Sequence, residues 1–139
     1  MKIVLDTNVL LQIISSRSIH HWIWEDIRRE KFILCLTTDI ILEYEEILIR
    51  KRNEELAQLI LEILLLMPNH VRVEKYFSFG LPTYDIDDQK FLDCAIACGA
   101  TYLITEDKHF NEVKNKDLFL VKIVSPSQLL EICKDVVDI

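Results

Sequence analysis

KIVLDTNVLL, residues 2–11, contains an apolar run at residues 3–5, a polar triplet at residues 6–8 and a second apolar run at residues 9–11. This pattern predicts a strand buried on both faces, followed by a helix that the polar residues 6–8 can cap. Open α/β sheets place their binding crevices outside the carboxyl ends of their strands. Asp6 therefore stands where either a helix cap or a site residue is expected, and this stretch alone leaves both interpretations open.

The rest of the chain predicts an alternation of short buried strands and amphipathic helices. Further strands are expected at residues 32–36, 71–73, 101–105 and 119–124. Helices are expected at residues 19–29, 39–52, 53–67, 88–98 and 127–137. This order predicts an α/β fold of three layers, α/β/α, with a central, mostly parallel sheet of about five strands and helices on both faces.

The composition is that of a single globular domain. The chain has 139 residues, of which 50% are hydrophobic, enough for a substantial core. We therefore expect residues 1–139 to form one domain. Two glycines in the whole chain cannot make the glycine-rich loop of a dinucleotide or nucleoside-triphosphate enzyme, so those classes are excluded.

The cysteines and the apolar runs favour a cytoplasmic protein. The four cysteines show neither a CxxC pair nor zinc-finger spacing, and we expect buried thiols in a reducing compartment at Cys35, Cys94, Cys98 and Cys133. No apolar run is long enough to cross a membrane, and the first residues do not resemble a signal peptide. A cytoplasmic location without a membrane partner is therefore expected.

Helical phase separates the acids of the predicted helix 39–52. Its apolar residues form one stripe, with Glu43 at the edge and Glu46 pointing well away. A carboxylate at the rim of a buried face needs a partner, which a metal ion or a cationic side chain would provide. Glu43 is therefore a candidate site residue, and Glu46 is expected to be a solvated charge.

The same argument separates two acids of the predicted helix 88–98. Asp88 lies in the first turn on the apolar face of this helix. Asp93 is expected on the polar side, as a solvated charge. Asp88 is therefore placed like a site residue and Asp93 is not.

Another acid follows the predicted strand 101–105. Because the carboxyl ends of parallel strands meet at one edge, we expect Asp107 to lie near Asp6. Four acids then converge, namely Asp6, Glu43, Asp88 and Asp107. Crowded carboxylates raise one another's pKa values unless a divalent cation neutralises them, and hard oxygen ligands suit Mg²⁺ or Mn²⁺. Such cations would also let a protein of net charge −7 approach nucleic acid, which it otherwise repels at long range.

Three stretches of the chain resemble the PIN domain family, ribonucleases of bacteria and archaea that include toxins of the VapC type. The stretches are IVLDTNVLL at residues 3–11, TTDIILEYEEIL at 37–48 and DDQKFLDCAIACGATYLITEDKHF at 87–110. The resemblance covers nearly the whole chain and is strongest to the toxins of the family. It implies a five-stranded parallel sheet in the order 3-2-1-4-5, frequent homodimers and, in toxin members, an antitoxin partner.

The resemblance also implies roles for individual residues. The metal-binding acids of the family match Asp6, Glu43, Asp88 and Asp107. Asn8 and Thr105 match polar residues that support the site by hydrogen bonding. Glu106 departs from the small or neutral residue usual at its position, which leaves open whether Glu106 or Asp107 faces the metal.

These observations predict a Mg²⁺- or Mn²⁺-dependent endoribonuclease that acts as the toxin of a toxin–antitoxin system. Lys108 and the basic runs 28–31 and 50–52 are candidate contacts for the RNA backbone. The alternative is a catalytically silent module that keeps the PIN fold for binding a partner. A phosphatase of the HAD type also begins with an acid after its first strand, but it needs a second Asp where this chain has Asn8.

Overall fold

The computed structural model describes residues 1–74, 86–107 and 121–137, with the backbone alone at residues 86–88 and 136–137. Within this part of the chain, five strands pair in one parallel sheet in the order β3-β2-β1-β4-β5. The strands are β1 Lys2–Leu5, β2 Ile33–Leu36, β3 His70–Arg72, β4 Tyr102–Ile104 and β5 Lys122–Val124. The predicted α/β/α class and the strand order implied by the resemblance are confirmed.

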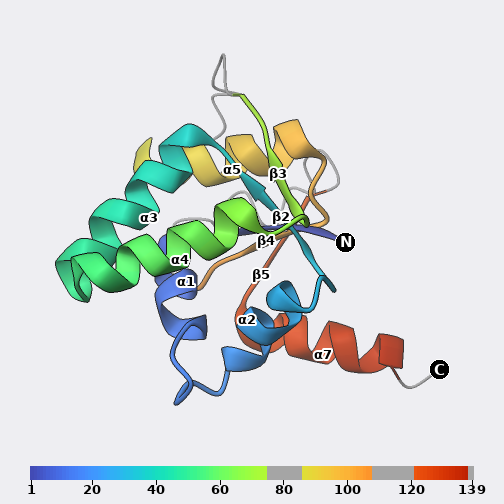
Figure 1. The fold of residues 1–139 in the computed structure, drawn as a ribbon. Helices are drawn as coiled ribbons and strands as arrows, with labels where there is room; N and C mark the ends of the chain where they lie inside the picture. Colours follow the sequence, from blue (N-terminus) through green and yellow to red (C-terminus); the bar gives the residue numbers. More distant parts are fainter. Residues whose placement is uncertain (75–85, 108–120, 138–139) are drawn as a thin grey trace.

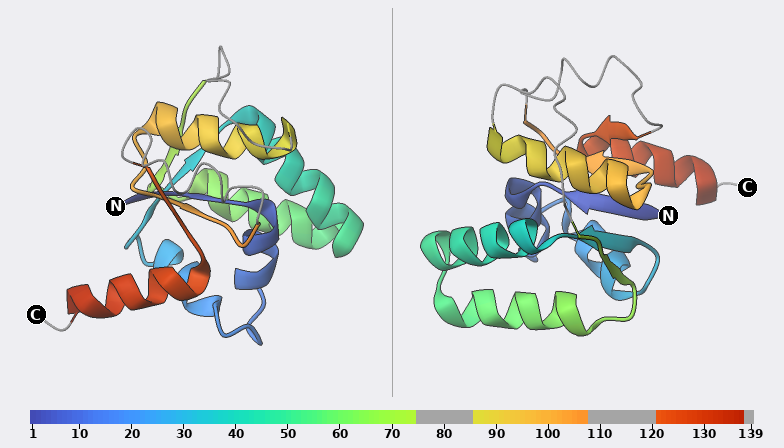
Figure 2. Two further views of the ribbon diagram at one scale, coloured as in Figure 1. Left: turned by 180° about the vertical axis from the view of Figure 1, so that it is seen from behind. Right: turned by 90° about the horizontal axis from the view of Figure 1, so that it is seen from above.

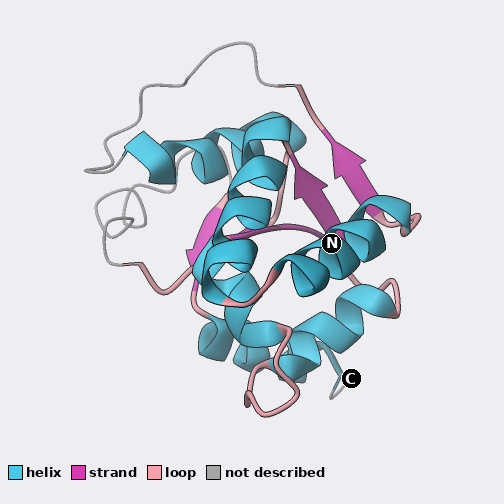
Figure 3. Ribbon diagram, turned by 60° about the vertical axis from the view of Figure 1, so that its left-hand side comes forward, coloured by secondary structure: helices cyan, strands magenta, loops and turns pink. Residues whose placement is uncertain are grey.

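Helices cover both faces of this sheet (Figure 3). Those of the described residues are α1 Thr7–Ile13, α2 His21–Arg28, α3 Thr38–Lys51, α4 Glu54–Leu66, α5 Ile86–Cys98 and α7 Pro126–Val137. α5 packs across β1, β2 and β4, and α2 and α7 lie on the opposite side of the sheet (Figures 1 and 2). α3 and α4 pack side by side and extend beyond the sheet. None of these helices is long and apolar enough to cross a membrane.

The first apolar run forms the centre of the core. Residues 3–5 of β1 are fully buried, and α3 presents Ile40, Tyr44 and Leu48, which are fully buried as well. The Tyr44 hydroxyl donates a hydrogen bond of 2.5 Å to the carbonyl oxygen of Leu5. Burial raises the pKa of Tyr44 well above its ordinary value of 10.0, so the phenol keeps the proton that this bond needs. α3 is therefore anchored at the carboxyl end of β1.

Side chains and one glycine fix the ends of three helices. Thr37 Oγ1 accepts a hydrogen bond of 3.2 Å from the backbone N–H of Ile40 at the start of α3. Asn53 Oδ1 accepts one of 2.8 Å from the N–H of Leu56 at the start of α4. Gly99, with a φ of 70°, follows the end of α5 in the left-handed region that glycine adopts most easily. The cap at Thr37 fixes where α3 begins, and α3 carries Glu43, the candidate acid at the rim.

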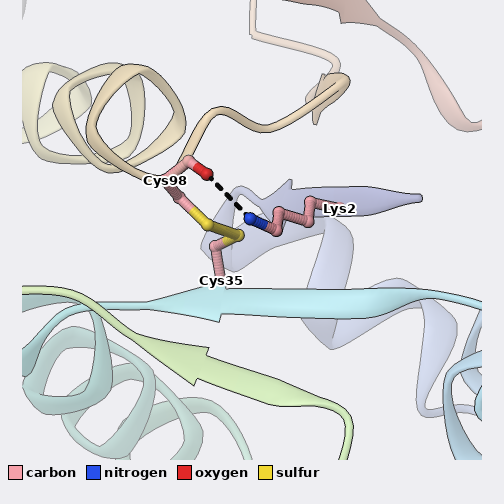
Figure 4. The surroundings of a disulfide bond; sticks show 3 residues. All are labelled: Lys2, Cys35 and Cys98. Carbon is pink, nitrogen blue, oxygen red and sulfur yellow. Dashed lines mark hydrogen bonds between the residues drawn. A yellow bond between two sulfur atoms is a disulfide. The ribbon is translucent and has the colours of Figure 1, made fainter.

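A disulfide joins Cys35 of β2 to Cys98 at the end of α5 (Figure 4). The two Cα atoms are 6.5 Å apart, and Lys2 Nζ donates a hydrogen bond of 3.3 Å to the Cys98 carbonyl oxygen. The prediction of four thiols is wrong for this pair, because spacing cannot reveal that α5 packs across β2. Cys94 and Cys133 are free, and burial raises the pKa of the Cys94 thiol to about 12.

Candidate functional site

Asp6 lies at the carboxyl edge of the sheet, directly after β1. It precedes α1, but its side chain makes no capping hydrogen bond. Asp6 Oδ2 instead accepts a hydrogen bond of 2.8 Å from Thr105 Oγ1. Asp6 is 6% exposed and Thr105 is 5% exposed. The side chain of Asp6 therefore does not cap α1, and Thr105, which follows β4, holds it instead.

The loop after β4 brings two further acids to this edge. Thr105 Oγ1 accepts a hydrogen bond of 3.0 Å from the backbone N–H of Asp107. Thr105 therefore contacts both Asp6 and the turn that carries Asp107. Glu106 is exposed, and its Oε2 accepts a hydrogen bond of 3.0 Å from Gln12 Nε2 of α1.

A cleft of about 680 Å³ lies at the same edge, within the size range of small-molecule sites. Its polar lining comes from α1, from the end of α3 and from the two loops after β1 and β4. These polar residues are Asp6, Asn8, Gln12, Lys51, Arg52, Glu106 and Asp107. Asp6 and Asp107 thus border a space that a ligand can enter.

Glu43 has two partners at the rim of α3. Lys90 Nζ of α5 lies 2.8 Å from Glu43 Oε1, with 16% of the Lys90 and 18% of the Glu43 side chain exposed. The Thr7 hydroxyl donates a hydrogen bond to Glu43 Oε2. The partner expected for this carboxylate was a metal ion or a cation, and the chain itself supplies a cation. A carboxylate has about four acceptor positions, so these two contacts leave some of its capacity unused.

Burial and charge act together on Asp6. Burial is the main cause that raises the pKa of Asp6 above its ordinary value of 3.8, the hydrogen bond from Thr105 opposes the rise, and the charges of Asp107 and Glu43 add to it. A divalent cation would relieve this repulsion, so the oxygen donors fit Mg²⁺ or Mn²⁺. Among the described side chains, no three of Asp, Glu, His or Cys lie close enough together to hold a metal ion.

α5 carries the remaining candidate acid. The backbone places Asp88 in the first turn of α5, but its side chain lies outside the described residues, and so does all of Lys108. The expectation that Asp93 is solvated is wrong, since it is 1% exposed and accepts a hydrogen bond of 2.8 Å from Gln89 Nε2. The reason is that residues 91–95 are all buried, so α5 is enclosed on more than one side. Helical phase identifies the buried residues of a helix only where the helix packs through a single face.

Lys90 and Thr7 contact Glu43 and are not among the site residues that the sequence predicts. Lys90 and its partner Glu43 are 47 positions apart, so no local sequence pattern joins them. For Thr7 the sequence indicates only a helix-capping role. The sole sequence signal for Thr7 is its place in the polar triplet beside Asp6.

The fold and the acids at one edge of its sheet define an α/β/α protein with an acidic cleft at the carboxyl ends of the strands. The chain belongs to the PIN domain family, whose model matches residues 2–109. It is similar to the structure of VapBC2 from Rickettsia felis bound to a DNA fragment from their promoter, with a TM-score of 0.60 and 17% identity over 90% of this chain and 98% of that chain.

A second similar structure is that of VapBC-1 from nontypeable Haemophilus influenzae. Its TM-score is 0.59 and its identity 17%, over 91% of this chain and 99% of that chain. At such identity, the likeness to these two structures shows a shared fold. A search among curated proteins gave no match.

Replacing Asp6 by Asn should stabilise the metal-free protein at neutral pH. A raised pKa means that ionised Asp6 is penalised in the folded state. This penalty is present above the folded-state pKa, falls away as the pH drops through that pKa, and is absent below 3.8. Urea unfolding in EDTA should show Asp6→Asn more stable than wild type, with a difference that shrinks on acidification. A pH-independent difference between wild type and Asp6→Asn would contradict the penalty on ionised Asp6.

Proposed function

We propose that the protein is a Mg²⁺- or Mn²⁺-dependent endoribonuclease that acts as the toxin of a toxin–antitoxin pair. The observation that carries the proposal is the state of Asp6. This carboxylate is buried at the carboxyl edge of β1 and shares a cleft with Asp107. Burial, and to a smaller extent the charges of Asp107 and Glu43, raise its pKa. A carboxylate kept in such surroundings is typical of a functional site, and a bound cation would use its charge.

Asp6, Asp88 and Asp107 would hold the cation, and Glu43 would be a further ligand or would orient the attacking water. A bound divalent cation supplies Lewis-acid stabilisation to the phosphoryl group and lowers the pKa of a water molecule. The hydrogen bond from Thr105 keeps the Asp6 carboxylate in place for this task. A buried threonine directly after β4 suits the site because it contacts both Asp6 and the turn that carries Asp107.

Glu43 is oriented by this chain's own residues. Lys90 and Thr7 each contact one of its oxygens, which fixes the plane of the carboxylate. The remaining acceptor positions of Glu43 can take a hydrogen bond from the attacking water. Lys90 and Thr7 are therefore positioning residues in this proposal.

We assign the metal-facing position to Asp107 and not to Glu106. Thr105 Oγ1 hydrogen-bonds to both the Asp6 carboxylate and the backbone N–H of Asp107, and the two acids line the same cleft. Glu106 is exposed and hydrogen-bonded to Gln12. Asn8 is exposed and lines the cleft, where it would support the site by hydrogen bonding.

An antitoxin is the proposed protein partner. The two similar solved structures described above are of VapBC proteins, which supports this partner for a chain of the same fold. The homodimer, the cytoplasmic location and the organisation of residues 1–139 as one domain stay predictions.

Cleavage of defined single-stranded RNAs, alongside DNAs of the same sequence, tests the proposal directly. We expect RNA fragments in Mn²⁺ or Mg²⁺ and none in EDTA. A single-stranded DNA control shows whether the activity is confined to RNA. Absence of cleavage with either metal across a varied set of RNAs would contradict the proposal.

One observation favours the alternative, a catalytically silent binding module. Both oxygens of Glu43 already have partners, as in an ion pair that serves stability alone. The two functions differ in their response to metal, because a ligand that binds only the folded state stabilises it by about 2.7 kcal/mol at one hundred times its Kd. Thermal unfolding with and without Mn²⁺ therefore separates them, since the silent module should show no rise in Tm.

A further inference from the structure

The cleft that contains the acids also has a basic end. Lys51, the last residue of α3, and Arg52, which follows it, line the same 680 Å³ space as Asp6 and Asp107. The other side chains of the cleft come from α1 and the loop after β4. One continuous space therefore joins a negative region at the sheet edge to a positive region at the end of α3.

The two cations of this basic end are available to a ligand. Both side chains are exposed, and neither forms an ion pair with any acid of the described residues. Arg52 Nη1 donates a hydrogen bond of 3.1 Å to the Lys51 carbonyl oxygen at the end of the helix. A guanidinium has five N–H donors, so this contact leaves most of them for an anion.

The basic run at residues 28–31 does not line this cleft. Arg28 and Arg29 border a separate, smaller hollow of about 280 Å³ together with Glu25. Arg29 Nη2 lies 3.4 Å from Glu25 Oε2, so an acid already compensates its charge. Arg50 precedes Lys51 on α3 but does not line the cleft. The structure therefore separates Lys51 and Arg52 from the other cations of the two basic runs, which the sequence alone does not rank.

We propose that Lys51 and Arg52 form a phosphate-binding subsite for single-stranded RNA, next to the acids that act on the scissile bond. The inference rests on the proposed nuclease function and names how its substrate is held. Phosphodiesters are the ligands that Arg and Lys bind through charge-assisted hydrogen bonds. A cleft of 680 Å³ accommodates a short segment of one strand. In a chain of net charge −7, two uncompensated cations beside the acids would offset the repulsion that the acidic edge exerts on RNA.

Salt-dependent RNA binding tests this subsite. Affinity of a labelled single-stranded RNA is measured in EDTA, where no metal-dependent cleavage occurs, for wild type, Lys51→Gln/Arg52→Gln and the comparison pair Arg28→Gln/Arg29→Gln. Each phosphate contact on a single strand contributes about 0.7 to the slope of log K against log salt concentration. Loss of two contacts should reduce that slope by about 1.4 and weaken binding at low salt by roughly tenfold or more, whereas the comparison pair should match wild type.

Two outcomes distinguish the failure of this inference from the failure of the proposed function. If wild type cleaves RNA with Mn²⁺ but Lys51→Gln/Arg52→Gln keeps the wild-type slope, the subsite is refuted and the nuclease stands. If wild type neither cleaves nor binds any RNA, both are refuted. Far-UV circular dichroism melting of each variant shows whether the fold is kept. Single variants Lys51→Gln and Arg52→Gln, each expected to lower the slope by about 0.7, replace the double variant if it does not fold.

Discussion

Asp6→Asn is expected to lower kcat/KM for Mn²⁺-dependent RNA cleavage by about 10³-fold. A metal ion that polarises a phosphoryl oxygen contributes several kcal/mol, and each 1.36 kcal/mol of barrier is a factor of ten. Asn has the size of Asp and keeps an oxygen that can accept the hydrogen bond from Thr105. The substitution therefore removes the charge of a buried carboxylate and should leave the fold intact.

A matched control for this variant is Asp135→Asn. Asp135 is exposed on α7 and does not line the cleft, so its loss of charge should leave cleavage unchanged. Thermal unfolding gives a readout that does not depend on activity, because Mn²⁺ should raise the Tm of wild type and of Asp135→Asn more than that of Asp6→Asn. If Asp6→Asn cleaved RNA at the wild-type rate, Asp6 would not be an active-site residue.

The order of strands and helices could be predicted because each element has a local signal. The alternation of short apolar runs with helical periodicity indicates a parallel α/β sheet, and the polar triplet after β1 marks its carboxyl edge. Helical phase placed Glu43 at the rim of α3, where the structure finds it 18% exposed. The exact strand order came from the family resemblance, since periodicity says nothing about which strands are neighbours.

Pairs of residues far apart in the chain could not be predicted in the same way. Lys90 and Glu43 are 47 positions apart, and Cys35 and Cys98 are 63 apart. Both pairs form because α5 packs against α3 and β2 at once, which is a property of the folded chain. The same packing buries Asp93, which helical phase alone assigns to the solvated side.

Reduction of the Cys35–Cys98 disulfide should lower the free energy of unfolding by about 4 kcal/mol. A disulfide restricts the unfolded chain, and the restriction grows with the length of the loop that it closes. Here the two cysteines are 63 positions apart, and they tie the end of α5 to β2 in the core. Because both residues are buried, the reductant must be added to unfolded protein before refolding.

Urea unfolding with and without a phosphine reductant measures this loss. Cys35→Ala/Cys98→Ala should unfold at the same urea concentration in both conditions, because it lacks the bond that the reductant breaks. Denatured wild type without reductant should titrate with two thiols, those of Cys94 and Cys133. Four thiols in that titration would show that the pair is not oxidised in the purified protein. A wild type that is oxidised but insensitive to reductant would instead show that the cross-link does not restrict its unfolded state.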